Sequence, residues 1–559
     1  MITLTKEQED IIKSLDTEDS IIKINAYAGS GKTATVTELI KEIRKADKDC
    51  NILYLVFNKN ACEEAKTKFD KLNLNVECFT AHGFALKRLM LNNWRISQKT
   101  GVENPVHVIS NIFGDDYLSL RNGNPNYKYV SYQKVNDLFD VYGKVWDGMF
   151  TFRENILKGG YKHLLKTEPK QCDIDFFQEY YNFLLKQGKY THNMYLKEYA
   201  LYVSETIRRY RYVFLDEAQD LNKFMLNIIK KIEYKKLYVV GDTYQQIYHW
   251  NGAINALEQF ECKTYPLSKS FRITNKECEI ANTVLSSRYK KFKDNNVPVV
   301  NLDKGDEEYD KNLLTLLFRL NGTMFDYAVE YMLEGNIKVH FLDSYNGEAT
   351  DKFEETFAVP LYMFKKLLQC NINMKDEYKQ FNKLFKTKKT CKEVDTFIRL
   401  ADKEGMDFRN FIYEQFNALP LNLMKYFQFY HRNEERIIDV LTALKESENI
   451  ENPEKEYWLC TAHRSKGLEW DNVKIAEDRW SLGSDEEVNL VYVACTRAKK
   501  HLDYSAIADM IGIEWEEDEE ENVGVKDEEN VGVNDLEDEW VELYDNDPYS
   551  EFSIKLLDK

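Results

Sequence analysis

The sequence of 559 residues predicts an α/β protein with two parallel-sheet domains in tandem, each carrying an inserted, mainly helical subdomain. Three observations lead to this fold class. Short apolar runs recur and end in glycine, acidic or polar turns. Helical patterns such as TATVTELIKEIRK separate several of these runs, and two long stretches rich in Tyr, Lys and Leu read as mostly helical. Strands that alternate with helices are typical of a parallel sheet covered on both faces.

The expected strands fall into two groups along the chain. The first group has five runs, which are IIKINAYA (21–28), ILYLVFN (52–58), VECFT (76–80), YVFLDE (212–217) and LYVVGD (237–242). The second group has six runs, which are TYPLS (264–268), LLTLLFR (313–319), KVHFLD (338–343), YWLCTA (457–462), NVKIAED (472–478) and NLVYVACT (489–496). Each group supplies enough strands for one sheet, so we expect two α/β domains.

Two gaps between these strands, at residues 82–212 and 343–458, are too long for loops inside a compact domain. We therefore expect each gap to hold an inserted helical subdomain. The expected division is a first domain at 1–90 and 205–272 with its insertion at 91–204, a second domain at 273–343 and 450–510 with its insertion at 344–449, and an acidic tail at 511–559.

Most of the net charge of −18 comes from the C-terminal tail. Residues 511–559 hold 19 of the 94 acidic side chains and 3 of the 76 basic ones, a net charge of −16, and include the tandem repeat EENVGVKD–EENVGVND (520–535). Such an acid-rich sequence with few core residues is expected to be disordered. The rest of the chain is almost neutral, so its charge does not exclude a nucleic-acid ligand.

The sequence disfavours a membrane or secreted protein and a protein with a zinc or iron–sulfur site. No apolar run approaches the length of a membrane span, and the N-terminal MITLTKEQED has no secretory-signal pattern. The ten cysteines form no CxxC pair, which argues against zinc or iron–sulfur sites. We therefore expect no membrane association and a reducing intracellular location, cytoplasmic or, in a eukaryotic host, nuclear.

A phosphate-binding loop is predicted at AYAGSGKT (26–33), which follows an expected strand and precedes an expected helix. Its glycines let backbone N–H groups approach phosphates, and the helix N-terminus favours an anion. Lys32 would contact the β- and γ-phosphates of ATP, and the Thr33 hydroxyl would bind Mg²⁺. Ala26 departs mildly from the usual glycine, and a glycine-rich turn without a ligand is the alternative. The expected ATP-binding residues of the loop are Ala28, Gly29, Ser30, Gly31, Lys32 and Thr33.

YVFLDEAQD (212–220) predicts the second half of the ATP site. A buried strand would deliver Asp216 to the metal ion, and Glu217 would orient and deprotonate the attacking water. Charge that develops on the γ-phosphate needs further cations, for which Arg272 in LSKSFRIT and Arg497 in VYVACTRAKK are candidates. A surface salt bridge is the alternative for a single arginine. Together with the phosphate-binding loop, these residues indicate ATP hydrolysis.

In their order along the chain, these motifs and several others resemble the UvrD/Rep type of superfamily 1 helicases, over most of residues 1–510. The stretches that carry the resemblance are LTKEQEDII (4–12), AYAGSGKT (26–33), FNKNA (57–61), TAHG (80–83), DEAQD (216–220), GDTYQQIYHWNGA (241–253), SFR (270–272), LLFRLN (316–321), TAHRSKGLEWD (461–471) and NLVYVACTRA (489–498). Within this group, THNMYLKEYAL (191–201) is similar to a stretch of the F-box DNA helicase family. Because the helicase motifs begin within the first ten residues, we expect no F-box.

The resemblance implies two RecA-like domains with ATP and Mg²⁺ between them. It also implies ATP-driven movement along single-stranded DNA, 3′ to 5′, with duplex unwinding. Carried onto this sequence, Gln8 would read adenine, Phe271 would stack on it, and Gln245 would sense the γ-phosphate. Arg272 and Arg497 would reach the γ-phosphate from the second domain.

By the same resemblance, Glu469 would contact the nucleotide sugar or hold an arginine. Three positions depart from the family pattern. Ala34 follows GKT where several relatives have arginine, which bears on adenine stacking from that side. Asn251 replaces the arginine of WRGA, and Asn489 stands where UvrD itself has arginine.

Binding of a single strand without sequence preference needs a basic path for phosphates and rings on which bases stack. The candidates lie at strand ends and are Phe57, Asn58, Lys59, Thr80, His82, Tyr248, Trp250, His463 and Arg464. Core packing is the alternative for each ring. The basic-aromatic stretches 381–390 and 425–432 would contact duplex or form solvated helix faces. The acidic tail would keep the chain soluble or compete with DNA.

The expected function is a DNA-dependent ATPase and helicase in recombination, repair or replication. It would act as a monomer on single strands and single-strand/duplex junctions, with recombination or replication proteins as candidate partners. One alternative is a translocase that strips proteins from DNA with little unwinding; another is a non-enzymatic binding module, which would need decayed catalytic positions. In GDTYQQIYHWNGA, we expect Gln245 to face the γ-phosphate while Tyr248 and Trp250 reach the single strand.

Overall fold

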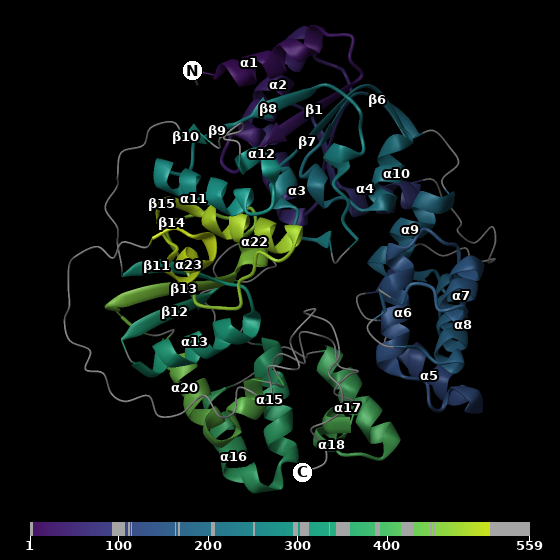
Figure 1. Cartoon of the computed structure of the whole chain (residues 1–559). Coiled ribbons are helices and arrows are strands. Elements are labelled where there is room, and N and C mark those ends of the chain that lie inside the picture. The colour runs from purple at the N-terminus through teal and green to yellow at the C-terminus, as the bar shows by residue number, and fades with distance from the viewer. Residues whose placement is uncertain are drawn as a thin grey trace. The chain divides into compact units, whose positions relative to one another are not determined.

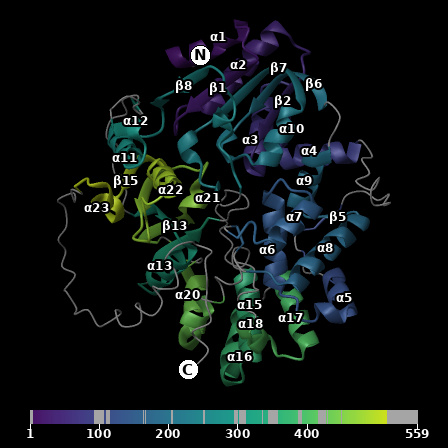
Figure 2. The same cartoon turned by 45° about the vertical axis from the view of Figure 1, so that its right-hand side comes forward.

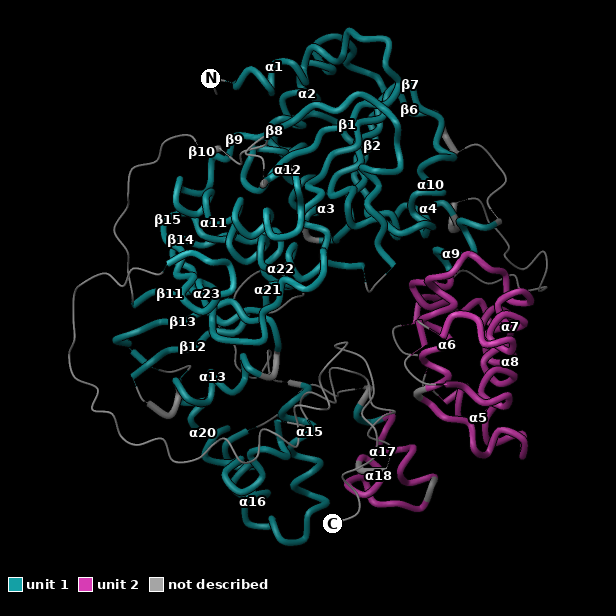
Figure 3. The backbone as a smooth tube through the Cα atoms, in the orientation of Figure 1, with its two compact units in different colours: residues 1–94, 195–395, 425–514 teal, residues 95–194, 396–424, 515–559 magenta. Residues whose placement is uncertain are grey.

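Two parallel sheets, of six and five strands, form the frame of the protein in the computed structural model (Figure 1). Helices accompany both sheets, which confirms the predicted α/β class with parallel sheets. The chain divides into two compact units (Figure 3), one with residues 1–94, 195–395 and 425–514, which holds both sheets, and one with the described residues of 95–194 and 396–424. The structure describes residues 4–91, 107–109, 112, 115–162, 164–165, 168–202, 207–249, 252–293, 300–301, 312–334, 336–342, 358–385, 392–414, 427, 429–447, 450–451 and 453–514.

The first sheet contains the five strands expected from the N-terminal group and one strand more. Its order is β3 (Glu77–Thr80), β2 (Ile52–Val56), β6 (Ile207–Leu215), β7 (Ile232–Gly241), β1 (Ile21–Ala26) and β8 (Thr264–Leu267). β2 is buried at every position, as strands covered on both faces are. Because all the strands are parallel, their carboxyl ends share one edge, where ligands bind in α/β sheets.

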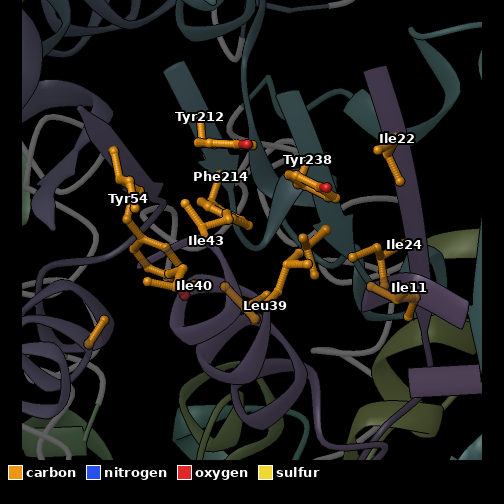
Figure 4. Close-up of a cluster of buried hydrophobic side chains, with 14 of the residues drawn as sticks. Ile11, Ile22, Ile24, Leu39, Ile40, Ile43, Tyr54, Tyr212, Phe214 and Tyr238 are labelled. Atoms are coloured by element: carbon orange, nitrogen blue, oxygen red, sulfur yellow. The ribbon is translucent and has the colours of Figure 1, made fainter. Parts of the chain in front are cut away.

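A continuous core anchors the helix that follows β1. The helices of this region are α1 (Lys6–Lys13), α2 (Lys32–Ala46), α3 (Lys59–Lys71), α4 (Ala81–Leu91) and α10 (Lys223–Lys230). In Figure 2, α1 lies beside α2 and β8. Leu39, Ile40 and Ile43 of α2 share one buried cluster with Phe214 and Tyr238, whose rings stack 5.0 Å apart (Figure 4). The loop between β1 and α2 is therefore fixed at both ends.

The second sheet has the order β12 (Ile337–Phe341), β13 (Lys455–Thr461), β11 (Leu313–Phe318), β14 (Trp470–Ile475) and β15 (Ala498–Asp503). The longer helices beside it are α11 (Asn275–Ser286), α13 (Asn321–Glu334), α20 (Ile437–Ser447) and α22 (Asp485–Cys495). Shorter elements are α12 (Lys290–Lys293), α21 (Ala462–Ser465), α23 (Ala508–Ile511), and β9 (Lys269–Ser270) paired with β10 (Val300–Asn301).

Two expectations about individual strands are wrong. Residues 264–268 belong to the first sheet as β8 rather than to the second group. Residues 489–496 are not a strand, since α22 covers almost all of them. Residues 488–495 are all buried, and a helix buried on every side has the same continuous apolar run as a buried strand. The sequence reading also misses β15, because AKKHLD is too polar to suggest a strand.

Both long gaps between strands are mainly helical. The first holds α5 (Asp115–Gly123), α6 (Tyr132–Lys144), α7 (Met149–Leu157), α8 (Gln171–Lys186) and α9 (His192–Tyr202), with the paired β4 (His107–Val108) and β5 (Lys189–Tyr190). The second holds α15 (Ala358–Cys370), α16 (Lys375–Leu384), α17 (Lys392–Glu404) and α18 (Phe408–Glu414). The exact domain boundaries stay predictions, and the tail from residue 515 lies outside the described residues. In the part of the chain that is described, no helix has the length and apolarity to cross a membrane.

Candidate functional site

The loop between β1 and α2 is built on two glycines with a left-handed backbone. Gly29 has a φ of 70°, and Gly31, at the N-cap of α2, has a φ of 78°. Because Gly31 has no side chain with which to cap the helix, the first N–H groups of α2 are left to an incoming anion. The N–H of Ala28 donates to the Tyr492 hydroxyl at 3.2 Å, so α22 also contacts this loop.

Gly29→Ala is expected to lower the free energy of unfolding by roughly 2 kcal/mol or more. A Cβ at Gly29 would lie 2.5 Å from the Cβ of Arg272 and 2.6 Å from the Oγ of Ser270, at a φ that strains alanine. Gly405→Ala is the matched control, because its φ is also 70° but no described atom lies within 4 Å of the added Cβ. Urea unfolding measures both variants, and equal losses of stability would contradict the steric argument.

Lys32, the first residue of α2, contacts Glu217, with 3.0 Å between Nζ and Oε1. Glu217 follows Asp216 after β6 and has a left-handed φ of 51°. Such a backbone is strained in a residue other than glycine, and strain of this kind clusters at functional sites. The Nε2 of Gln219 donates to the second carboxylate oxygen of Glu217. The structure therefore brings Lys32 and Glu217 together, while their catalytic roles stay predictions.

Asp216 is buried after the end of β6, where two donors orient its carboxylate. The hydroxyl of Tyr54 donates to Oδ2, and the N–H of Glu217 donates to Oδ1 at 2.9 Å. Thr33 is exposed in the first turn of α2. A carboxylate and a hydroxyl suit Mg²⁺, which is usually held by one or two protein groups together with water and phosphate oxygens. The residues predicted to bind the metal ion therefore fit it.

The charges of this group favour an ionised Glu217 and a protonated Lys32. Burial raises the pKa of Glu217, but Lys32, Lys466 and the hydrogen bond from Gln219 lower it more strongly, to about 2. Burial opposes the charge on Lys32, yet the nearby Glu217 and Asp216 raise the pKa of the ammonium overall. Burial, and then the charge of Glu217, raises the pKa of Asp216. Glu217 is thus ionised at neutral pH, as a general base has to be.

Gln245 lies in a short helix after β7, where a buried acid holds its side chain. Its Nε2 donates to Oδ2 of Asp242 at 2.8 Å, and the same oxygen accepts from the Tyr492 hydroxyl at 3.3 Å. Burial raises the pKa of Asp242 to about 6, although Lys32 lowers it. Because Tyr492 also contacts Ala28, Gln245 belongs to the hydrogen-bond network of the phosphate-binding loop.

The two predicted arginines are held in different ways. The Nη2 of Arg272 pairs with the Oε2 of Glu469 at 2.6 Å, so Glu469 holds an arginine here. Arg497 is almost fully buried, and its guanidinium donates to three groups nearby, the carbonyls of Val493 and Leu468 and the hydroxyl of Thr496. Burial, and then the neighbouring charge of Arg272, lowers the pKa of Arg497 to about 9. Arg497 is held by buried groups rather than by an exposed ion pair, whereas Arg272 pairs with Glu469, whose side chain is 43% exposed, so the surface salt bridge stays the alternative for Arg272.

Gln8 and Phe271 meet at Gly31. A Cβ on Gly31 would lie 3.3 Å from the Nε2 of Gln8 and 3.5 Å from the ring of Phe271. Two contacts fix the Gln8 amide, since Oε1 accepts from the N–H of Thr5 and Nε2 donates to the hydroxyl of Thr35, each at 3.0 Å. Phe271 is 39% exposed, which leaves its ring open to a ligand. Both residues predicted to bind adenine therefore lie beside the phosphate-binding loop, and adenine recognition stays a prediction.

Three residues predicted to bind DNA lie together although they come from three motifs. The rings of Phe57 and Tyr248 stack with their centres 5.6 Å apart. The hydroxyl of Tyr248 donates to the carbonyl of His463 at 3.3 Å. The predicted Trp250 and the departure at Asn251 lie outside the described residues.

Two more of the predicted DNA-binding residues cap helices. The Oδ1 of Asn58 accepts from an N–H in the first turn of α3 at 2.7 Å, and the Oγ1 of Thr80 accepts from one in α4 at 3.0 Å. These caps place the N-termini of α3 and α4, which attract anions, after β2 and β3. Lys59 and Arg464 are exposed, and His82 packs edge-on against Tyr195 with ring centres 6.0 Å apart.

The side chains of this region that sequence reasoning misses include these four, Tyr54, Asp242, Lys466 and Tyr492. Asp242, Lys466 and Tyr492 lie inside stretches that were quoted as motifs. Their place in those motifs is the feature of the sequence from which they could have been predicted. Tyr54 belongs to an ordinary buried strand, and no pattern distinguishes it from its neighbours.

Comparisons with known proteins agree with the motifs. Residues 4–264 match the UvrD/REP helicase N-terminal domain, and residues 457–502 match the UvrD-like helicase C-terminal domain. The chain is 27% identical over 546 residues to the F-box DNA helicase protein 1 of Schizosaccharomyces pombe, covering 89% of this chain and 57% of that protein. It is 26% identical over 539 residues to the F-box DNA helicase 1 of Gallus gallus, covering 90% and 49%, and 26% identical over 312 residues to the ATP-dependent DNA helicase PcrA of Bacillus subtilis, covering 51% and 39%. The chain thus spans about half the length of the F-box relatives.

Proposed function

As the chain belongs to the UvrD/Rep-type DNA helicases, whose two domain models it matches, we propose that it hydrolyses ATP with Mg²⁺ to move along single-stranded DNA. The observation that carries this proposal is the contact of Lys32 with Glu217, beside Asp216, at the carboxyl edge of the first sheet. Burying such a set of charges costs desolvation energy. A non-enzymatic binding module would have no use for it.

In the proposed reaction, the ammonium of Lys32 exchanges Glu217 for the β- and γ-phosphates. The released carboxylate of Glu217 orients a water molecule for attack and accepts its proton. Thr33 and Asp216 would hold Mg²⁺, which neutralises charge on the phosphate oxygens when bound. Tyr54 keeps Asp216 in position for this task.

Two arginines contribute positive charge to the same reaction. Arg272 and Arg497 would stabilise the charge that develops on the γ-phosphate. Arg272 first has to exchange Glu469 for a phosphate oxygen, so its arrival can depend on the nucleotide. Gln8 and Phe271 would hold the adenine beside the phosphate-binding loop.

A single DNA strand is the proposed track. The stacked rings of Phe57 and Tyr248 offer a platform for bases, and the N-termini of α3 and α4 attract phosphates. None of these groups reads the edge of a base, so we expect binding without sequence specificity. We propose that the protein works as a monomer on single strands and their junctions with duplex.

Movement from 3′ to 5′ is the proposed direction, and unwinding of tailed duplexes tests it. Duplexes with either a 3′ or a 5′ single-stranded tail are mixed with the protein, with and without ATP, and strand separation is measured. We expect unwinding only with ATP and the 3′ tail. Preference for the 5′ tail would contradict the direction, and ATP hydrolysis that does not respond to DNA would contradict the function itself.

Recombination, repair or replication is the proposed setting, in the cytoplasm or, in a eukaryotic host, the nucleus. The second candidate function is removal of proteins from DNA with little strand separation. It is favoured by the similarity to F-box DNA helicases, which extends over 89% of this chain. Strong unwinding of bare duplex with no effect on a recombinase filament would exclude this second candidate.

Gln245→Ala is expected to lower ATP hydrolysis itself by about 10- to 100-fold, whereas Trp250→Ala is expected to reduce DNA stimulation more than the basal rate. Gln245 is tied through Asp242 to the network around Lys32, while Trp250 is predicted to stack on a base. ATP hydrolysis with and without oligothymidylate separates the two effects. The same defect in both variants would show that the two ends of this loop have no separate tasks.

A further inference from the structure

The ammonium of Lys466, just after α21, is buried among groups of the first domain. Its Nζ lies 2.5 Å and 2.8 Å from the two carboxylate oxygens of Asp220 and donates to the backbone carbonyl of Gln245. It also lies 5.0 Å from the ring centre of Tyr248. The side chains of Lys466 and Asp220 are only 8% and 2% exposed. Water therefore screens these contacts little.

The partners of Lys466 belong to segments with different tasks in the proposed reaction. Asp220 closes the turn that begins at the proposed general base, to whose carbonyl its N–H donates at 3.0 Å. Gln245 is the proposed γ-phosphate sensor, and Tyr248 stacks on Phe57 in the proposed platform for bases. One ammonium has three N–H donors, which is enough to engage all of these segments together.

We propose that Lys466 is a positioning residue that couples the state of the ATP site to the grip on single-stranded DNA, an inference that rests on the proposed function. Lys466 comes from the second domain, whereas Asp220, Gln245 and Tyr248 come from the first. A movement between the domains that lengthens one of these contacts also disturbs the others. Closure of the domains on ATP would therefore fix the sensor and the base platform in the same step.

A buried ion pair that serves only stability would behave differently. Removing one partner of such a pair leaves a buried charge uncompensated, which lowers the thermal stability. Basal and DNA-stimulated hydrolysis would then fall in the same proportion. Coupling through Lys466 lowers the ratio of the stimulated to the basal rate, so this ratio is the quantity that separates the two roles.

The test compares Lys466→Met, Lys466→Arg and the control Lys474→Met. Methionine keeps most of the length of the side chain without its charge, and arginine keeps the charge. Lys474 pairs with Asp503 at 3.1 Å in the same domain but contacts none of the three partners. ATP hydrolysis is measured with and without oligothymidylate, alongside thermal unfolding. We expect Lys466→Met to lower the stimulation ratio by about 5- to 50-fold, Lys466→Arg to recover part of it, and Lys474→Met to match the wild type.

Each outcome decides the proposal. A stimulation ratio in Lys466→Met equal to that of the wild type would refute the coupling, as would a proportional fall of both rates. If Lys466→Met does not fold, the double variant Lys466→Met/Asp220→Asn removes both buried charges and should show the same fall in the ratio. A wild-type protein whose ATP hydrolysis ignores DNA would instead overturn the proposed function itself.

Discussion

Lys32→Ala is expected to lower DNA-stimulated ATP hydrolysis by about 100-fold or more. The ammonium of Lys32 stands at the start of α2, where the N–H groups of the helix also attract phosphate. In the structure it balances the carboxylate of Glu217, and with ATP it would balance the developing charge on the γ-phosphate. Alanine removes this charge and leaves the partly buried carboxylate of Glu217 without the ammonium that contacts it, so phosphate binding and the position of Glu217 both suffer.

The control for Lys32→Ala is Lys45→Ala on the same helix. Lys45 is exposed and pairs with Glu42 at 2.6 Å, far along α2 from the phosphate-binding loop. Steady-state hydrolysis with oligothymidylate measures both variants, and circular dichroism checks that both are folded. If Lys32→Ala hydrolysed ATP as fast as Lys45→Ala does, this result would contradict the proposal that the protein is an ATPase.

Glu217→Gln is expected to lower kcat by about 100- to 10,000-fold while ATP still binds. Despite its burial, the neighbouring Lys32 and Lys466 hold the pKa of Glu217 at about 2, so the wild type has an ionised base at neutral pH. Glutamine has nearly the same shape and its amide oxygen can accept from Lys32, but it cannot take a proton from water. The loss should therefore appear in the chemical step.

Single-turnover hydrolysis and equilibrium binding of a fluorescent ATP analogue separate these two effects of Glu217→Gln. Glu233→Gln is the matched control, because Glu233 lies in β7 of the same sheet and its half-exposed carboxylate pairs with Arg209 at 3.4 Å. A wild-type rate of the chemical step in Glu217→Gln would assign the general base to another group. A loss confined to ATP binding would assign Glu217 to binding instead.

The sequence is sufficient where a chemical requirement is local. A phosphate-binding loop needs glycines, a lysine and a following helix in consecutive positions, and residues 26–33 meet all of these requirements. The DEAQD motif needs a buried strand before it, which β6 supplies. Lys32, Asp216 and Glu217 can therefore be named from the pattern alone, and the structure brings them together as one group.

Contacts between distant segments cannot be predicted in the same way. Arg497 is predicted to follow a strand, yet it follows α22, because an apolar run that is buried on every side does not reveal its period. The hydrogen bond from Ala28 to Tyr492 joins residues 464 positions apart, and neither segment contains a pattern that predicts this contact. The same is true of Lys466 and Asp220, which only the packing of the two domains brings together.

The left-handed backbone at Glu217 strains the folded chain, whereas the proposed hydrolysis needs the carboxylate that this residue carries. Glycine would relax the backbone, since it adopts a positive φ without strain, but it carries no carboxylate. A search for thermally stable variants would therefore reward the loss of Glu217 and discard hydrolysis with it. Substitutions meant to raise the thermal stability should therefore leave Glu217 unchanged and be made at other positions of the chain.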